Sequence, residues 1–177
     1  MKLRSLVIGL LAAALPAAQG QEQLSDEEAL NRFVGVWTLV HWEETLADGT
    51  KRVHPVSAGH IIYSDIGRMC AVVMDPNRPK WQSATPTPEE ALAGMNSRAF
   101  YAYCATAEMH AAEGYVLHHT VIDKVPNAVG AVRKRWFNFE GPDRVVLRID
   151  PAELADPIVE SVLLWERVVD ERGNVSP

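Results

Sequence analysis

Eight runs rich in β-branched and aromatic residues follow one another along the chain, and turn residues such as Asp48-Gly49 separate neighbouring runs. Many of these runs alternate hydrophobic with polar positions, which is typical of strands that bury one face. Short turns between successive strands favour antiparallel neighbours. The predicted strands cover residues 36–46, 60–64, 68–74, 100–110, 115–123, 131–139, 144–149 and 161–169.

One short helix is predicted between the third and fourth strands. Thr87 can cap it, Pro88 suits its first position, and Glu90 completes a capping box with Thr87. Leu92 and Met95 recur on one face, so we expect this face to lie against an apolar surface. Eight strands and one helix predict an all-β fold, an eight-stranded up-and-down antiparallel barrel.

The N-terminal residues have the layout of a secretory signal peptide, with Lys2 and Arg4 before an apolar run and small residues before Gly20. The apolar run is too short to span a bilayer core of about 30 Å, so no membrane span is predicted. We expect cleavage after Gly20 and a periplasmic or secreted protein. The predicted parts are a signal peptide (1–20), a lead-in (21–32), the barrel (33–170) and a flexible tail (171–177).

Charge and motifs exclude several classes of partner. Removal of Lys2 and Arg4 from the 17 basic residues leaves 15 against 23 acidic ones, a net charge of −8. An acidic protein lacks the field that attracts a phosphate backbone, so no nucleic-acid partner is predicted. The sequence contains neither HExxH nor CxxC and has no phosphate-binding glycine loop. No metal and no cofactor are therefore predicted.

The two cysteines, Cys70 and Cys104, leave two alternatives open. They can form a disulfide in an oxidising compartment, or they can be two buried free thiols. Their spacing alone does not show whether the side chains face each other.

Gly35-x-Trp37 on the first strand and Arg167 on the last resemble the lipocalins. In that family the tryptophan floors the barrel and the arginine packs across its ring. A guanidinium over an indole is a cation–π contact worth about 0.5–2 kcal/mol. The resemblance implies that this contact joins the first strand to the last. Because it lacks a side chain, Gly35 is expected to let the chain bend at the closed end, just before Trp37.

More closely, the chain is similar to bacterial and fungal lipocalin-like domain proteins. The similar features are FVGVWTLV (33–40), the YSDxGRM hairpin (63–69), the TPEE helix start (87–90), His118-His119, Pro126 with Gly130, and LLWERV (163–168). Ala105-Thr106-Ala107 departs from the family pattern. The resemblance implies an eight-stranded lipocalin-like barrel. It also implies that His118 is the family's recurring histidine and that Arg135 is the arginine kept in the family pattern.

A barrel of eight strands has an interior wide enough for side chains or one small ligand. Because strand side chains alternate between faces, every second residue is a candidate for the lumen. On this rule His41 follows Trp37 inward, and Tyr101 shares a face with Tyr103. The predicted ligand-binding residues are Trp37, His41, Tyr63, Tyr101, Tyr103, His118 and Arg135.

Two pairs of residues carry alternatives. Adjacent strand residues point to opposite faces, so only one of His118 and His119 can face the lumen, and we favour His118. Arg133 and Arg135 share a face, which is either the lumen or the solvated outer wall. In the lumen, an arginine can bind a ligand carboxylate through two hydrogen bonds. Trp81 either lines the open mouth or covers apolar surface.

Three functions fit this pattern. The first is a binding module that holds a small hydrophobic molecule with a polar end. The second is a barrel isomerase or cyclase acting on a natural-product-like substrate, with His118, Tyr103 and Glu108 as candidate acid–base residues. Glu108 meets Tyr103 only if a bulge interrupts the strand. The third is a structural or interaction domain with a filled core; the oligomeric state stays open.

Overall fold

We describe the protein from a computed structural model that covers residues 24–96 and 98–169. The predicted signal peptide (1–20) and flexible tail (171–177) lie outside the described residues, as do residues 21–23 of the predicted lead-in. No helix in residues 24–96 or 98–169 is long and apolar enough to cross a membrane.

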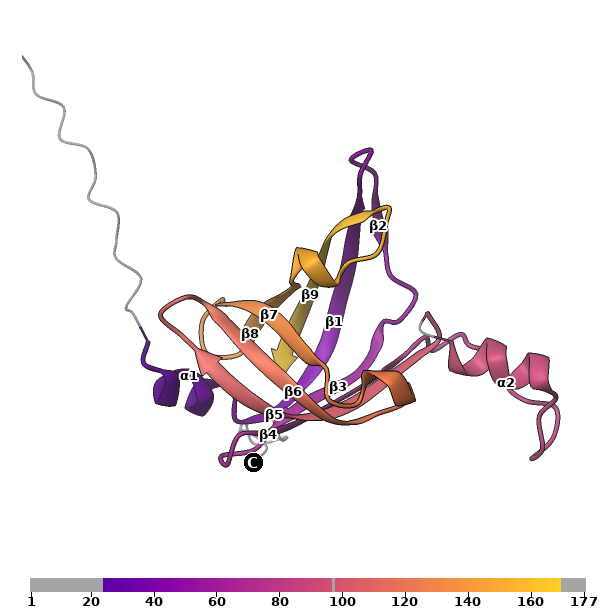
Figure 1. The fold of residues 1–177 in the computed structure, drawn as a ribbon, viewed down its shortest axis with the longest axis horizontal. Helices are drawn as coiled ribbons and strands as arrows, with labels where there is room; N and C mark the ends of the chain where they lie inside the picture. Colours follow the sequence, from indigo (N-terminus) through magenta and orange to yellow (C-terminus); the bar gives the residue numbers. More distant parts are fainter. Residues whose placement is uncertain (1–23, 97, 170–177) are drawn as a thin grey trace, which may run out of the picture.

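Eight antiparallel strands form a closed barrel, as the sequence predicts (Figure 1). Each strand pairs with the next along the chain, and the last returns to pair with the first. A ninth, short strand, β2 (Lys51–Val53), pairs with the far end of β1. The barrel strands are β1 (Gly35–Leu46), β3 (Ala58–Tyr63), β4 (Arg68–Met74), β5 (Phe100–His110), β6 (Tyr115–Asp123), β7 (Val132–Phe139), β8 (Arg144–Ile149) and β9 (Ile158–Arg167).

The closing pair of strands, β1 and β9, contains a bulge. Trp37 pairs with Arg167 and Leu39 with Trp165, and after a register shift His41 pairs with Leu164. An extra residue in one strand exchanges the inward and outward positions beyond it. The inner face of β1 therefore continues from Leu39 through Trp42 and Glu44 instead of His41.

A helix that was not predicted precedes the barrel. The predicted lead-in contains α1 (Asp26–Phe33), which begins with a capping box between Ser25 and Glu28. Its buried residues, Ala29 and Phe33, are four positions apart and share one face. Asp26 accepts a hydrogen bond from the main chain at Ala111, at the turn between β5 and β6. The helix therefore closes one end of the barrel.

The second helix, α2 (Pro88–Met95), has the predicted start, with Thr87 and Glu90 in a capping box. Its surroundings differ from the prediction, because it extends away from the barrel (Figure 1) and Leu92 is 73% exposed. Trp81 covers part of it and donates to the main-chain oxygen of Glu90 over 3.2 Å. Two short 3-10 helices, η1 (Pro126–Ala128) and η2 (Pro151–Glu153), complete the described elements.

Cys70 and Cys104 form a disulfide, which decides between the two alternatives. They occupy directly opposite positions on β4 and β5, with their Cα atoms 4.0 Å apart. Neighbouring inward residues, Ala71 and Tyr103, also lie opposite each other, so the disulfide is on the outer face of the wall. The bond crosslinks two strands that are already hydrogen-bonded.

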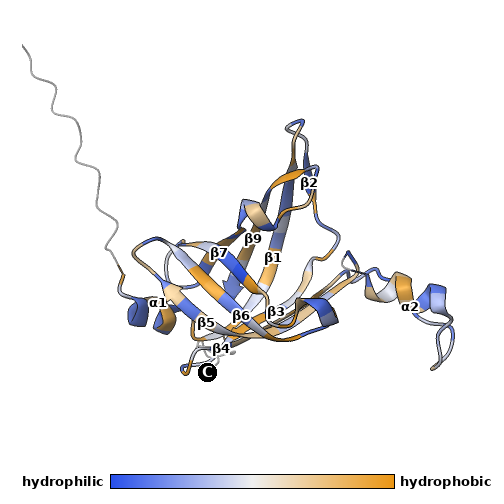
Figure 2. Ribbon diagram, in the orientation of Figure 1, coloured by the Kyte–Doolittle hydropathy of each residue, from blue (hydrophilic) through white to orange (hydrophobic). Residues whose placement is uncertain are grey.

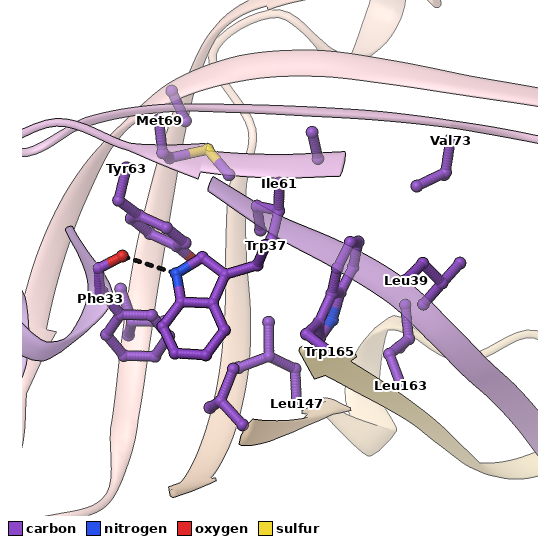
Figure 3. Packing of buried hydrophobic residues seen from close by; sticks show 14 of the residues in the cluster. Phe33, Trp37, Leu39, Ile61, Tyr63, Met69, Val73, Leu147, Leu163 and Trp165 are labelled. Carbon is purple, nitrogen blue, oxygen red and sulfur yellow. Dashed lines mark hydrogen bonds between the residues drawn. The ribbon is translucent and has the colours of Figure 1, made fainter. Parts of the chain in front are cut away.

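Hydrophobic and hydrophilic residues alternate along the barrel strands (Figure 2). The inward set forms one core, and aromatic side chains gather at the end closed by α1 (Figure 3). Phe33 lies 4.8 Å from Tyr63, 5.2 Å from Phe137 and 4.9 Å from Phe139, measured between ring centroids. The opposite half of the barrel is the part that holds open space.

Candidate functional site

Trp37 forms the floor of the barrel and has no exposed surface. Its indole nitrogen Nε1 donates to the main-chain oxygen of Phe33 over 2.7 Å (Figure 3). The guanidinium carbon of Arg167 lies 4.0 Å from the centroid of the indole ring. The contact expected between the first and last strands is therefore present, and α1 adds a second layer beneath it.

Arg167 also connects the barrel to the chain before it. Its Nη1 donates to the main-chain oxygen of Val34 over 2.7 Å, and its Nη2 to that of Arg32 over 2.5 Å. Gly35 follows with a backbone φ of 120°, a conformation that residues with a Cβ atom rarely adopt. The glycine thus makes the bend from α1 into β1 that the sequence reading assigned to it.

A pocket of about 370 Å³ lies above this floor. Small-molecule sites commonly have volumes of about 300–1,000 Å³. One side of the pocket is apolar and comes from alternate residues of four strands. These residues are Ile61 of β3, Ala71 and Val73 of β4, Leu147 and Ile149 of β8, and Leu163 and Trp165 of β9.

The other side and the outer end of the pocket are polar. Tyr101 and Tyr103 of β5 and Arg133 and Arg135 of β7 form the wall opposite the aliphatic residues. A second group, at the outer end, comprises Trp42, Glu44, His54 and Arg98. The combination of apolar walls with a few placed polar groups is typical of a ligand site.

The predicted ligand-binding residues fall into three groups. Tyr101, Tyr103 and Arg135 line the pocket. Trp37, Tyr63 and His118 are fully or almost fully buried beneath it. His41 lies outside, with 47% of its side chain exposed, because the bulge in β1 turns it away from the lumen.

His118 is enclosed between two tyrosines and has no exposed surface. Its Nε2 lies 2.9 Å from the Tyr63 hydroxyl oxygen, and its Nδ1 lies 2.8 Å from that of Tyr103. The inward histidine is therefore His118, whereas His119 on the outer face contacts Glu108. Tyr103 lines the pocket and His118 does not, so His118 reaches the pocket only through the Tyr103 hydroxyl.

Burial keeps this chain of side chains uncharged. Desolvation, followed by the positive charges of Arg135 and Arg133, holds the pKa of His118 well below its usual value of 6.5. Burial raises the pKa of Tyr103 to about 12. A neutral imidazole has one donor and one acceptor nitrogen, so it donates to one tyrosine and accepts from the other.

We expect the free energy of unfolding to fall as the pH is lowered from 7 to 5. Burial also lowers the pKa of His54, to about 4, so both histidines stay neutral in the fold but bind protons below about pH 6.5 when unfolded. Each adds a slope of up to about 1.4 kcal/mol per pH unit in that window.

Urea denaturation at pH 7, 6 and 5 measures this slope. His118→Gln removes one of the two groups and should reduce the slope. An equal slope in wild type and His118→Gln would show that His118 does not titrate in this way.

Arg133 and Arg135 both line the pocket, which decides between lumen and outer wall. Arg135 Nη1 donates to Glu153 Oε2 over 2.8 Å and to the main-chain oxygen of Lys134 over 2.7 Å. Arg133 Nη2 donates to Asp123 Oδ2 over 2.6 Å, and its guanidinium lies 5.0 Å from the Tyr103 ring centroid. Each arginine thus has its own carboxylate partner.

Glu44 is a buried carboxylate that the sequence reading did not select. It is 4% exposed, and Oε2 accepts from Arg52 Nε over 2.7 Å and from Arg98 Nη1 over 3.4 Å. His54 Nε2 lies 3.9 Å from Glu44 Oε1, and the His54 ring stacks on Trp42 at 3.9 Å. Regular alternation from Trp37 predicts that Glu43 faces the lumen. The bulge after Leu39 exchanges the two faces and places Glu44 there instead.

Glu108, a candidate acid–base residue, does not face the lumen. Its side chain is 52% exposed and contacts His119 Nε2 over 2.7 Å and His110 Nε2 over 2.9 Å. The β5–β6 pairing has one extra residue, but it lies on β6. Side chains of β5 therefore alternate without interruption from Tyr103 to Glu108, which puts these two residues on opposite faces. In residues 24–96 and 98–169, no cluster of His, Cys, Asp and Glu is suited to a metal ion.

Comparison with known proteins gives one family match. The model of a family described as "Lipocalin-like domain" matches residues 34–168. No curated protein matches the chain. Similar solved structures include a redesigned β-barrel (8% identity, 79% of this chain and 95% of that chain, TM-score 0.41) and a de novo designed fluorescence-activating β-barrel (13% identity, 82% and 100%, TM-score 0.41).

Proposed function

Because the chain belongs to the family of lipocalin-like domain proteins, we propose that it binds one small, mainly apolar molecule inside its barrel. The observation that carries this proposal is the pocket of about 370 Å³ above a closed aromatic floor. A domain with a filled core would pack this space with side chains, as most protein interiors do. Ile61, Val73 and Leu163 offer the apolar contact area that favours such a ligand.

Binding fits the polar groups better than catalysis does. An acid–base residue should have a pKa near the working pH, whereas burial raises the pKa of Tyr103 to about 12. His118 has no contact with the pocket, and Glu108 lies on the outer wall. The isomerase or cyclase alternative therefore depends on Tyr103, with His118 as the residue that positions its hydroxyl.

The proposed place of action is the periplasm or the medium. Two features support it. The N-terminal residues have the pattern of a cleaved signal peptide. The bond between Cys70 and Cys104 is of the kind that persists in oxidising compartments and is rare in the cytosol.

Native mass spectrometry of protein purified from its own organism tests the binding function. We expect a bound small molecule in wild type and its loss in Ala71→Phe, where a phenyl ring enters the pocket. Ala102→Phe adds the same ring to a half-buried position opposite Val72, on the outer face, and should retain the molecule. The mass of the bare polypeptide in every wild-type preparation would contradict the proposal.

A further inference from the structure

Two hydrogen-bond donors on the pocket wall have no partner. Among the described residues, the buried side-chain polar atoms without one are Thr120 Oγ1, Arg133 Nε and Trp165 Nε1. Trp165 and Arg133 line the pocket, whereas Thr120 does not. A buried donor without an acceptor costs about 1–3 kcal/mol, so such atoms in a binding site indicate where a ligand acceptor belongs.

Trp165 lies at the inner end of the pocket. It is 2% exposed and pairs across the sheet with Leu39 of β1 and Val145 of β8, whose side chains carry no acceptor. Figure 3 shows it beside Trp37, with Leu39 and Leu163 on its other side. Trp165 lines the pocket, and these cross-strand neighbours supply no side-chain acceptor for its indole nitrogen.

The buried charges of the pocket are already compensated. Arg135 contacts Glu153 at 2.8 Å, and Arg133 contacts Asp123 at 2.6 Å. The carboxylate of Glu44 has Arg52 and Arg98, whose side chains are 39% and 45% exposed and therefore screened by water. A ligand carboxylate would therefore lose its hydration without meeting a buried arginine that lacks a counter-ion.

We propose that the bound molecule is uncharged, mainly apolar, and carries a carbonyl-type oxygen that accepts a hydrogen bond from Trp165 Nε1 at the inner end of the pocket. A second oxygen acceptor on the same molecule would meet Arg133 Nε. Ketones, esters, lactones and quinones belong to this class, whereas free carboxylic acids do not. The inference rests on the proposed binding function and specifies its ligand.

Three naphthalene probes of similar size test the inference. 2-Acetylnaphthalene carries a neutral carbonyl, 2-isopropenylnaphthalene replaces its oxygen by carbon, and 2-naphthoate carries a charge. Equilibrium dialysis gives the Kd of each. We expect wild type to bind the ketone about tenfold more tightly than the hydrocarbon, since one buried donor gains its acceptor, and to bind 2-naphthoate more weakly than the ketone.

Trp165→Phe removes the donor and keeps an aromatic ring. We expect it to bind the ketone and the hydrocarbon with similar Kd values. Trp136→Phe is the matched control, because Trp136 does not line the pocket and its Nε1 already donates to Asp150 Oδ2 over 3.1 Å. Trp136→Phe should retain the ketone preference.

The outcomes separate this inference from the proposed function. Equal binding of ketone and hydrocarbon by wild type, a preference for 2-naphthoate, or a ketone preference that survives Trp165→Phe would overturn the inference and leave a binding pocket. If wild type binds none of the three probes, both the inference and the pocket as a binding site are wrong.

Discussion

Replacing Trp37 with alanine is expected to lower the free energy of unfolding by about 3–5 kcal/mol, the cost of truncating a large aromatic side chain in a packed core. Trp37 has no exposed surface, and its loss also leaves the Phe33 carbonyl without its indole donor. The guanidinium of Arg167 would lose its ring contact as well. Urea denaturation followed by circular dichroism measures the effect.

Trp81→Ala is the matched control for this prediction. The same truncation on a side chain that is 44% exposed, beside the protruding α2, should cost less than about 1 kcal/mol. Similar losses in the two variants would show that Trp37 is no more important to the fold than a surface tryptophan, which would contradict its place as the floor of the barrel.

Glu153→Leu is expected to destabilise the fold by about 3 kcal/mol, because it leaves the charge of Arg135 buried without its counter-ion. The Arg135 side chain is 8% exposed and lies 2.8 Å from the Glu153 carboxylate. Breaking a fully buried pair costs about 3–5 kcal/mol. Because the Glu153 side chain is 25% exposed, we expect a loss at the lower end of this range.

A double-mutant cycle tests the cause of this loss. Removing both charges with Arg135→Met and Glu153→Leu should recover most of this loss, since neither charge of the pair remains and only the Lys134 main-chain N–H still lacks its Glu153 acceptor. As a control, Glu166→Leu breaks a pair with Arg144 in which both side chains are about half exposed, and should cost less than about 1 kcal/mol. A double variant as unstable as Glu153→Leu alone would contradict the account.

The barrel could be predicted from the sequence because its signals are local. Each strand has its own alternating pattern, and each turn its own glycine or proline, so the order of elements needs no long-range information. The helix α1 carried a local signal too, Ser25 followed by Glu28 in a capping box, but only Ala29 and Phe33 in it are buried. These two residues also share one face, so the local signals were sufficient to predict the helix, and the interpretation of residues 21–32 as a lead-in overlooked them.

The candidate site was predicted less completely, for two physical reasons. A one-residue bulge after Leu39 exchanges the faces of β1, so His41 moves to solvent and Glu44 to the lumen, and nothing in the run of residues marks the position of that bulge. The second reason is pairing between distant residues. Arg135 meets Glu153 only when η2 folds over the end of β7, and this contact decides whether the arginine is available to an anionic ligand.

The central claim, an interior binding site, is tested most directly by titration with the neutral apolar fluorophore N-phenyl-1-naphthylamine. We predict an increase of its fluorescence on wild type that saturates at one probe per chain. Ala71→Phe should weaken binding by about tenfold or more, whereas Ala102→Phe, on the outer wall, should match wild type. Binding by wild type and Ala71→Phe with the same Kd, or no binding by wild type, would contradict the claim.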